Sequence, residues 1–266
     1  MTLGELLREK KKNGKKILAP YVCAGFPAIE ATLPILGALA QAGADCVELG
    51  VPFSDPLADG PMIQKASSVA LQNGMTLSRA LEMAESFTAL SGTPVLLMSY
   101  LNPILRMGPE QFAQKARDAG VSACIVPDLP FEETGLLAGS PPLVRFAAPN
   151  TPDERLSRIA ALNPPFLYCV SVFGVTGARS GIESYTLDFL RRVGAATPVP
   201  ALAGFGVSSA AQAASLAKDA DGVIVGSALV KALESTHGPS EAARAAAAFL
   251  KPFRKSLDAA SKAATS

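Results

Sequence analysis

The sequence of 266 residues contains no tryptophan and only one histidine, and charged residues make up 18% of it. The formal net charge is +1, so the chain has no strong field of either sign that would attract nucleic acid or an anionic membrane surface. We therefore expect small-molecule chemistry, with no nucleic acid and no membrane as a partner. The one histidine, His237, lies in the polar segment "STHGPS" without a second metal ligand beside it, and we expect it at the surface without a catalytic role.

Cysteine is also scarce, and long hydrophobic runs are missing. Each of the four cysteines lies in a short apolar run, and none shows the close pairing that zinc sites use. This pattern predicts buried, reduced thiols in a cytoplasmic protein, namely Cys23, Cys46, Cys124 and Cys169. The N-terminal segment has no apolar stretch of signal-peptide length, and no later segment approaches the ~18 apolar residues of a membrane-spanning helix.

Eight short apolar runs alternate with segments of helical periodicity. Near-continuous apolar strands between helices are typical of a parallel sheet covered by helices. Eight such units in about 250 residues favour α/β architecture of the closed (β/α)8 type, a TIM barrel, over an open doubly wound sheet. The runs are KILAPYVCAG, DCVELG, PVLLMSY, SACIVPD, PLVRFAAP, FLYCVSV, VPALAG and GVIVG.

We expect one domain over residues 1–266, with a short helix in residues 1–16. The basic run from Arg8 to Lys16 is interpreted as the solvated end of this helix, with an interaction patch as the alternative. The Ala-, Ser- and Lys-rich end, residues 256–266, is predicted to be a frayed tail. Gly43, Gly120 and Gly194 each end a predicted helix just before a strand, which predicts left-handed helix caps.

The segment "ELGVPFSDPLADGP" follows the second predicted strand and carries three carboxylates without a basic residue. Glu48 ends the strand, so in a barrel it points into the mouth or the upper core, with Val47 and Leu49 facing the other side. A buried carboxyl without a partner acquires the raised pKa that suits proton transfer, although a buried glutamate paired with a donor fits the position too. Asp55 and Asp59 lie in the following loop, where turn chemistry is the simpler interpretation of each alone.

Glycine clusters follow the last three predicted strands as "GVTGARSG", "GFGVSS" and "GSALVK". Barrel enzymes often bind phosphate with the loops after strands seven and eight, and glycines there offer N–H groups without obstruction. Tight turns without a ligand remain the alternative. No lysine ends a predicted strand at the mouth and no cluster of His, Asp and Glu is present, so Schiff-base and metal-dependent aldolases are disfavoured.

These motifs, together with "PDLPFEE", occur in an order that resembles the α subunit of tryptophan synthase along almost the whole chain. The resemblance implies a lyase that cleaves indole-3-glycerol phosphate to indole and glyceraldehyde 3-phosphate. It also implies no cofactor in this subunit and an αββα heterotetramer, in which indole passes to a β subunit that contains pyridoxal phosphate. Glu48 then corresponds to the general acid/base, and Asp59 to the aspartate that accepts from indole N1–H.

The resemblance assigns further residues to three groups. Those of the glycerol and indole pocket are Tyr21, Tyr100, Ile125, Tyr168, Phe205 and Ile224, for which plain core packing stays an alternative. Those of the phosphate site are Gly177, Gly206, Gly226 and Ser227, and Thr176 corresponds to the residue that bonds Asp59 on loop closure. Those facing the β subunit are Asp55, Pro56 and Asn102.

Two departures from the family pattern are Phe26 and Phe173, which stand where other members often have polar or small residues. Two other functions stay open at this point. One is a non-catalytic barrel subunit that activates a β-type partner, and the other is a stand-alone indole-producing lyase.

Overall fold

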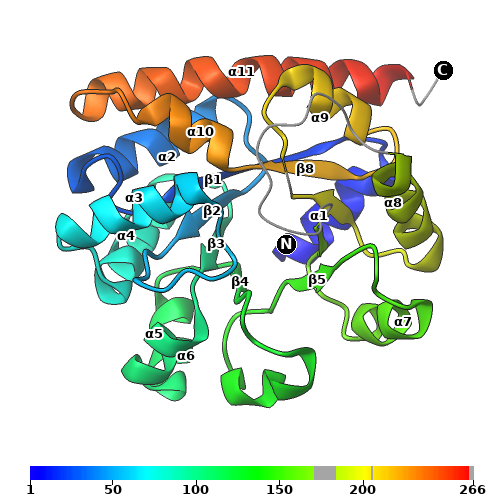
Figure 1. Cartoon of the computed structure of the whole chain (residues 1–266), viewed down its shortest axis with the longest axis horizontal. Helices are drawn as coiled ribbons and strands as arrows, with labels where there is room; N and C mark the ends of the chain where they lie inside the picture. Colours follow the sequence, from blue (N-terminus) through cyan, green and yellow to red (C-terminus); the bar gives the residue numbers. More distant parts are fainter. Residues whose placement is uncertain (171–183, 205, 264–266) are drawn as a thin grey trace.

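Strand β1 (Ile17–Cys23) pairs in parallel with β2 (Val47–Gly50) on one side and with β8 (Gly222–Val225) on the other. In this computed structural model, which describes residues 1–170, 184–204 and 206–263, the strand order is β4-β3-β2-β1-β8-β7-β6-β5. The first and last strands of the chain are thus neighbours, and the sheet curls into a barrel with helices around it (Figure 1). The remaining strands are β3 (Val95–Met98), β4 (Ala123–Ile125), β5 (Arg145–Ala147), β6 (Leu167–Cys169) and β7 (Ala201–Ala203).

The barrel is nearly closed, and its weakest junction lies between β4 and β5. Cys124 donates its N–H to Pro142 O (2.9 Å), and Val144 donates its N–H to Cys124 O (2.9 Å). These bonds form an isolated bridge rather than a ladder, and we call this junction the β4–β5 seam. All eight predicted strand segments contain the observed strands, and the predicted (β/α)8 barrel is confirmed.

Helical periodicity predicts helices in the segments EATLPILGALAQAG, TLSRALEMAESFTAL, PEQFAQKARDAG, ERLSRIAAL, YTLDFLRRV and SSAAQAASLAKDA, and each of them contains a helix. Thr76 and Ser209 cap two of them, because their side chains accept from the N–H groups of Arg79 and Gln212. The helices are α1 (Leu3–Lys12), α2 (Thr32–Gln41), α3 (Pro61–Gln72), α4 (Leu77–Leu90), α5 (Leu101–Met107), α6 (Pro109–Asp118), α7 (Asp153–Ala161), α8 (Ser184–Ala196), α9 (Ala210–Leu216), α10 (Ser227–Leu233) and α11 (Pro239–Ala263), with 3-10 segments η1 (Ile29–Ala31) and η2 (Phe131–Leu137).

The predicted glycine caps are confirmed at two of three positions. Gly43 and Gly120 have φ of +97° and +71°, the left-handed region that glycine enters without steric cost. Gly194 lies inside α8, so the predicted cap there was wrong. The helix continues for two more residues because they are alanines, the best helix formers.

Side chains of each strand alternate between two apolar layers. Ile17 and Leu96 fill the barrel interior, and Leu3 and Leu7 of α1 join this cluster, so α1 closes one end of the barrel. The outward side chains pack under the surrounding helices in a second, larger cluster. Val47 and Leu49 belong to that outer cluster, while Glu48 between them faces inward, as predicted.

Two lysines of the basic run, which the sequence predicted to be a solvated helix end, form ion pairs with the barrel instead. Lys10 forms an ion pair with Asp45 (2.6 Å), and Lys11 forms one with Asp221 (3.0 Å). Each aspartate precedes a strand and also accepts a backbone N–H from the strand beside it, from Leu18 of β1 and from the first residue of β7 respectively (both 2.8 Å). The side chains of both lysines are only 25% exposed, so the solvated interpretation was wrong for these two, which clamp α1 to the barrel. It holds for Lys12 and Lys15, which are exposed.

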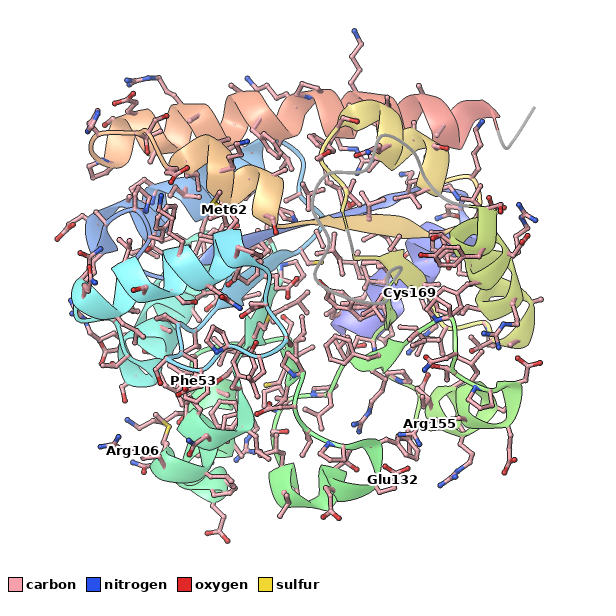
Figure 2. All side chains as sticks on the ribbon, viewed as in Figure 1. Phe53, Met62, Arg106, Glu132, Arg155 and Cys169 are labelled. Atoms are coloured by element: carbon pink, nitrogen blue, oxygen red, sulfur yellow. The ribbon has the colours of Figure 1, made fainter. Side chains whose placement is uncertain are left out.

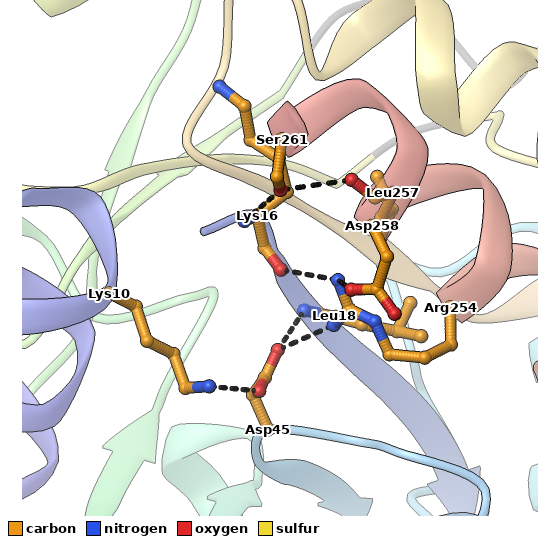
Figure 3. A network of polar contacts seen from close by, with 8 residues as sticks. All are labelled: Lys10, Lys16, Leu18, Asp45, Arg254, Leu257, Asp258 and Ser261. Atoms are coloured by element: carbon orange, nitrogen blue, oxygen red, sulfur yellow. Dashed lines mark hydrogen bonds and ion pairs between the residues drawn. The ribbon is translucent and has the colours of Figure 1, made fainter. Parts of the chain in front are cut away.

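The C-terminal helix shares this clamp (Figure 3). Arg254 pairs with Asp45 (3.1 Å) and donates to Lys16 O (2.9 Å), and Ser261 Oγ accepts from the Lys16 N–H (3.2 Å). Leu257 is fully buried. The predicted frayed tail was therefore wrong for residues 256–263, because α11 packs along α2 and α9 and its alanine-rich end sustains a helix.

The four cysteines are buried and free, as predicted, and His237 is exposed. Phe26, the first departure from the family pattern, is buried in the outer cluster. Within residues 1–170, 184–204 and 206–263, no helix has the length and apolar character needed to cross a membrane.

Candidate active site at the barrel mouth

Glu48 lies at the C-terminal end of β2, paired in register with Tyr21 of β1. Its side chain is fully buried, and in the described part of the chain neither carboxylate oxygen has a hydrogen-bond partner. Burial, and then the nearby charge of Asp59, raise the pKa of Glu48 to about 8. The alternative of a glutamate paired with a donor is thus contradicted, and the carboxyl is protonated at neutral pH.

Asp59 lies in the loop between β2 and α3 and is 7% exposed. Its Oδ2 accepts from the Tyr100 hydroxyl (3.0 Å), whose oxygen in turn accepts from the Ala58 N–H (3.0 Å). Burial raises the pKa of Asp59 to about 6, and the bond from Tyr100 opposes this rise. The Asp59 carboxylate therefore does more than form a turn, because its partner is a side chain from beyond β3.

The two carboxyls differ in charge near pH 7, which follows from these environments. Glu48 keeps its proton and Asp59 is mostly ionised, given their pKa values of about 8 and about 6. Pairs of carboxyl groups with separated pKa values serve as an acid and an anionic acceptor in enzymes. The mouth therefore holds one proton donor and one negative charge, facing the same space.

Two tyrosine rings approach glycines at the ends of neighbouring strands. The ring of Tyr21 lies against Gly50, and that of Tyr168 lies against Gly204, so closely that a Cβ at either glycine would overlap the ring. Burial raises the pKa of both tyrosines, and the charges of the two site carboxyls add to the rise. Both rings therefore face the carboxyl pair, and sequence reasoning missed that these glycines provide their space.

Aromatic and aliphatic side chains line the rest of this region. Ile125 and Ile224 are buried in the interior cluster, against which Tyr168 packs. The Tyr168 ring also lies 5.0 Å from that of Phe146, and the Tyr100 ring lies 5.3 Å from that of Phe53 (labelled in Figure 2). The sequence did not single out the two phenylalanines. The predicted pocket residues that the structure describes are thus brought to one end of the barrel.

The glycine turns after β7 and β8 lie at this end as well. Gly206 has φ of +67°, and Gly226 precedes Ser227, the first residue of α10. A Cβ at Gly226 would lie 3.5 Å from Tyr21 Cβ, which places this turn beside the tyrosine. Four further residues singled out from the sequence lie outside the described residues, namely Phe173, Thr176 and Gly177 after β6 and Phe205 after β7.

The residues predicted to face a partner lie on the outer side of the mouth. Asp55 is exposed and accepts from Ser54 Oγ (2.6 Å), and Asn102 is exposed in the first turn of α5. Between Pro56 and Asp59, Leu57 is 92% exposed. One loop thus presents polar and apolar side chains outward and the Asp59 carboxylate inward.

Comparisons with known proteins agree with this geometry. The model of the family described as "Tryptophan synthase alpha chain" matches residues 7–259. Tryptophan synthase alpha chains of Xanthomonas oryzae pv. oryzae and Xylella fastidiosa are 45% and 44% identical, over 95% and 97% of this chain and 97% and 98% of theirs.

Solved structures give the same result. The tryptophan synthase alpha chain from Legionella pneumophila has a TM-score of 0.87 at 34% identity, and covers 97% of this chain and 98% of its own. A tryptophan synthase chain from Mycobacterium tuberculosis has a TM-score of 0.85 at 35% identity, covering 96% of this chain and 97% of its own. With its barrel, its carboxyl pair and these relatives along nearly its whole length, the chain belongs to the tryptophan synthase alpha chain family.

Proposed function

We propose that the chain is a lyase of tryptophan biosynthesis that cleaves indole-3-glycerol phosphate to indole and glyceraldehyde 3-phosphate, the α reaction of tryptophan synthase. Membership of the family supports the reaction. The observation that carries the assignment of residues is the buried Glu48, which has no hydrogen-bond partner among the described residues, near the ionised Asp59.

In this proposal the Glu48 carboxyl donates its proton to indole C3, which makes the ring cationic. The resulting carboxylate then takes the proton from the hydroxyl on the carbon attached to C3. A carbonyl forms there, the C–C bond breaks, and its electron pair returns to the ring as indole is released. Glu48 thereby regains its proton, while the Asp59 carboxylate stabilises the transient positive charge by accepting from N1–H.

The surroundings of the pair suit such a substrate. Buried aromatic and aliphatic side chains offer an apolar pocket for the indole ring. At the glycine turns no side chain obstructs the backbone N–H groups, which can donate to the phosphate. We assign the glycerol and indole pocket to Tyr21, Tyr100, Ile125, Tyr168, Phe205 and Ile224. We assign the phosphate to Gly177, Gly206, Gly226 and Ser227, and the contact with Asp59 on loop closure to Thr176.

We further propose that the chain itself needs no metal and no cofactor, and that it works with a pyridoxal-phosphate-containing β subunit in an αββα heterotetramer. The outer side of the mouth supports this partner surface, since Asp55, Pro56 and Asn102 are exposed or half-buried there. The 92% exposed Leu57 beside them adds an apolar group that a partner would cover.

The test is a coupled assay with purified chain, indole-3-glycerol phosphate and a competent β subunit, following indole and tryptophan. We expect turnover that rises when the β subunit is added. Glu48→Gln should lower kcat by about 100-fold or more, because a general acid contributes that much. Glu110→Gln, an exposed change on α6, should have no effect.

Two outcomes would contradict parts of the proposal, and two more would distinguish it from the alternative functions. No turnover with a competent β subunit would exclude the lyase. Full activity of Glu48→Gln would remove the acid/base assignment but leave the reaction. A Glu48→Ala chain that still stimulates the β subunit would show that partner activation is separable from catalysis, and partner-free turnover at the complexed rate would identify a stand-alone lyase.

A further inference from the structure

A cavity of about 180 Å³ lies at the β4–β5 seam, and neither Glu48 nor Asp59 is part of its wall. Its wall includes Val126, Phe131, Leu143, Arg145, Arg155 and Ile159. These come from the end of β4, from η2, from β5 and from α7, so the cavity occupies the space that opens where the strand ladder is missing. An engineered cavity of about 150 Å³ accommodates benzene, and a ligand with a six-membered ring therefore fits by volume.

Arg145 is an unusual residue for its position. The adjacent Phe146 packs against the barrel interior, so by strand alternation Arg145 points outward, toward the helical layer. The other described strands fill this layer with apolar side chains, such as Leu167 directly beside Arg145 in register. Arg145 is half-buried there, so its guanidinium loses part of its hydration, which is costly unless a counter-ion accompanies it.

No counter-ion is present among the residues that the structure describes. Arg145 Nε is buried and has no hydrogen-bond partner. Glu132, the acid near the cavity, is instead paired with Arg155 (3.0 Å), and Figure 2 shows the two side by side. Arg155 and Arg158 both lie over the Phe131 ring, at 5.5 and 5.4 Å. Burial lowers the pKa of Arg145, in keeping with a charge that lacks compensation.

We propose that this cavity binds a small carboxylate whose apolar part fills the seam and whose carboxylate pairs with the Arg145 guanidinium. The planar guanidinium matches a carboxylate in two parallel hydrogen bonds. The apolar side chains of Val126, Leu143 and Ile159 suit an aliphatic or aromatic tail. The charged end of this site is distinct from the proposed lyase carboxyls, because Glu48 faces the barrel interior and Arg145 faces outward. The two regions share one wall residue, Phe146, whose ring lies 5.0 Å from that of Tyr168.

Calorimetric titration of the full chain with benzoate tests the proposal, with benzamide as the neutral analogue of equal size. We expect saturable benzoate binding with a Kd of about 1 mM, as is usual for so small a ligand. Benzamide should bind at least about tenfold more weakly than benzoate, because it lacks the charge that pairs with Arg145. Arg145→Gln should weaken benzoate binding about tenfold or more.

The matched control is Arg158→Gln. Arg158 belongs to α7 and lies over the Phe131 ring, but it is not part of the cavity wall. The substitution should leave the benzoate Kd unchanged. Equal binding of benzoate by the unsubstituted chain and Arg145→Gln, equal binding of benzoate and benzamide, or no saturation up to about 10 mM would each overturn the proposal. The comparison of the two ligands on the unsubstituted chain does not depend on the folding of any variant.

Discussion

Replacing Glu48 by glutamine should change how the stability of the chain depends on pH. The folded protein holds the Glu48 proton up to a pKa of about 8, whereas the ordinary carboxyl of the unfolded chain loses it near 4.5. Between these values unfolding releases a proton, so the free energy of unfolding falls as pH rises. One such group contributes about 1.4 kcal/mol per pH unit at most, and between pH 6 and 8 its contribution falls by about 2 kcal/mol.

The Glu48→Gln chain lacks this titration. Its free energy of unfolding, measured by urea denaturation at 25 °C, should therefore fall by about 2 kcal/mol less than that of the unsubstituted chain over the same pH range. The comparison uses the change with pH, so that any constant cost of a buried amide cancels. Glu110→Gln on the exposed face of α6 is the matched control and should run parallel to the unsubstituted chain.

Parallel curves for Glu48→Gln and the unsubstituted chain would refute the reasoning. They would mean that Glu48 titrates alike in both states, so that burial does not hold its proton. A smaller separation that vanished in an Asp59→Asn background would instead assign the raised pKa chiefly to the neighbouring charge, contrary to the order of causes given above.

Three further predictions concern activity and stability. The pKa values of about 8 for Glu48 and about 6 for Asp59 predict a bell-shaped pH profile of kcat/KM. Activity should fall below about pH 6, where Asp59 becomes protonated, and above about pH 8, where Glu48 loses its proton. A flat profile from pH 5 to 9 would contradict this prediction. Tyr100→Phe removes the hydrogen bond that lowers the pKa of Asp59, so this pKa and with it the acidic limb of the profile should move to higher pH. An unmoved limb would mean that the bond is absent in solution. Asp45→Asn should lower the free energy of unfolding in urea by about 3 kcal/mol, because it leaves the partly buried Lys10 unpaired and removes one of the two carboxylates that pair with Arg254. A loss below about 0.5 kcal/mol would show a solvated network.

The strands and the inward position of Glu48 were predictable because they depend on short-range patterns. An apolar run of four to eight residues identifies a strand wherever it lies, and a charged residue at its end is visible in the sequence. The position of Glu48 at the barrel mouth therefore follows from the order of residues alone. What the sequence pattern did not contain was that no described residue donates a hydrogen bond to Glu48, since that depends on side chains from several strands.

The errors occurred where contacts join distant parts of the chain. Lys10 looks solvated in a basic run, yet its partner Asp45 lies 35 positions away and belongs to another element. The end of α11 looks frayed by composition, yet Leu257 is buried against the barrel. No local pattern encodes either contact, because each arises only when the folded barrel brings separate segments of the chain together.

The clamp on α1 has a consequence for the order of events during synthesis. The helix is among the first residues to leave the ribosome, but Asp221, the partner of Lys11, is made some two hundred residues later. Leu3 and Leu7 likewise find their places only against strands that include β7 and β8. The segment that is made first can therefore complete its contacts only near the end of translation, and until then its apolar stripe stays available to chaperones.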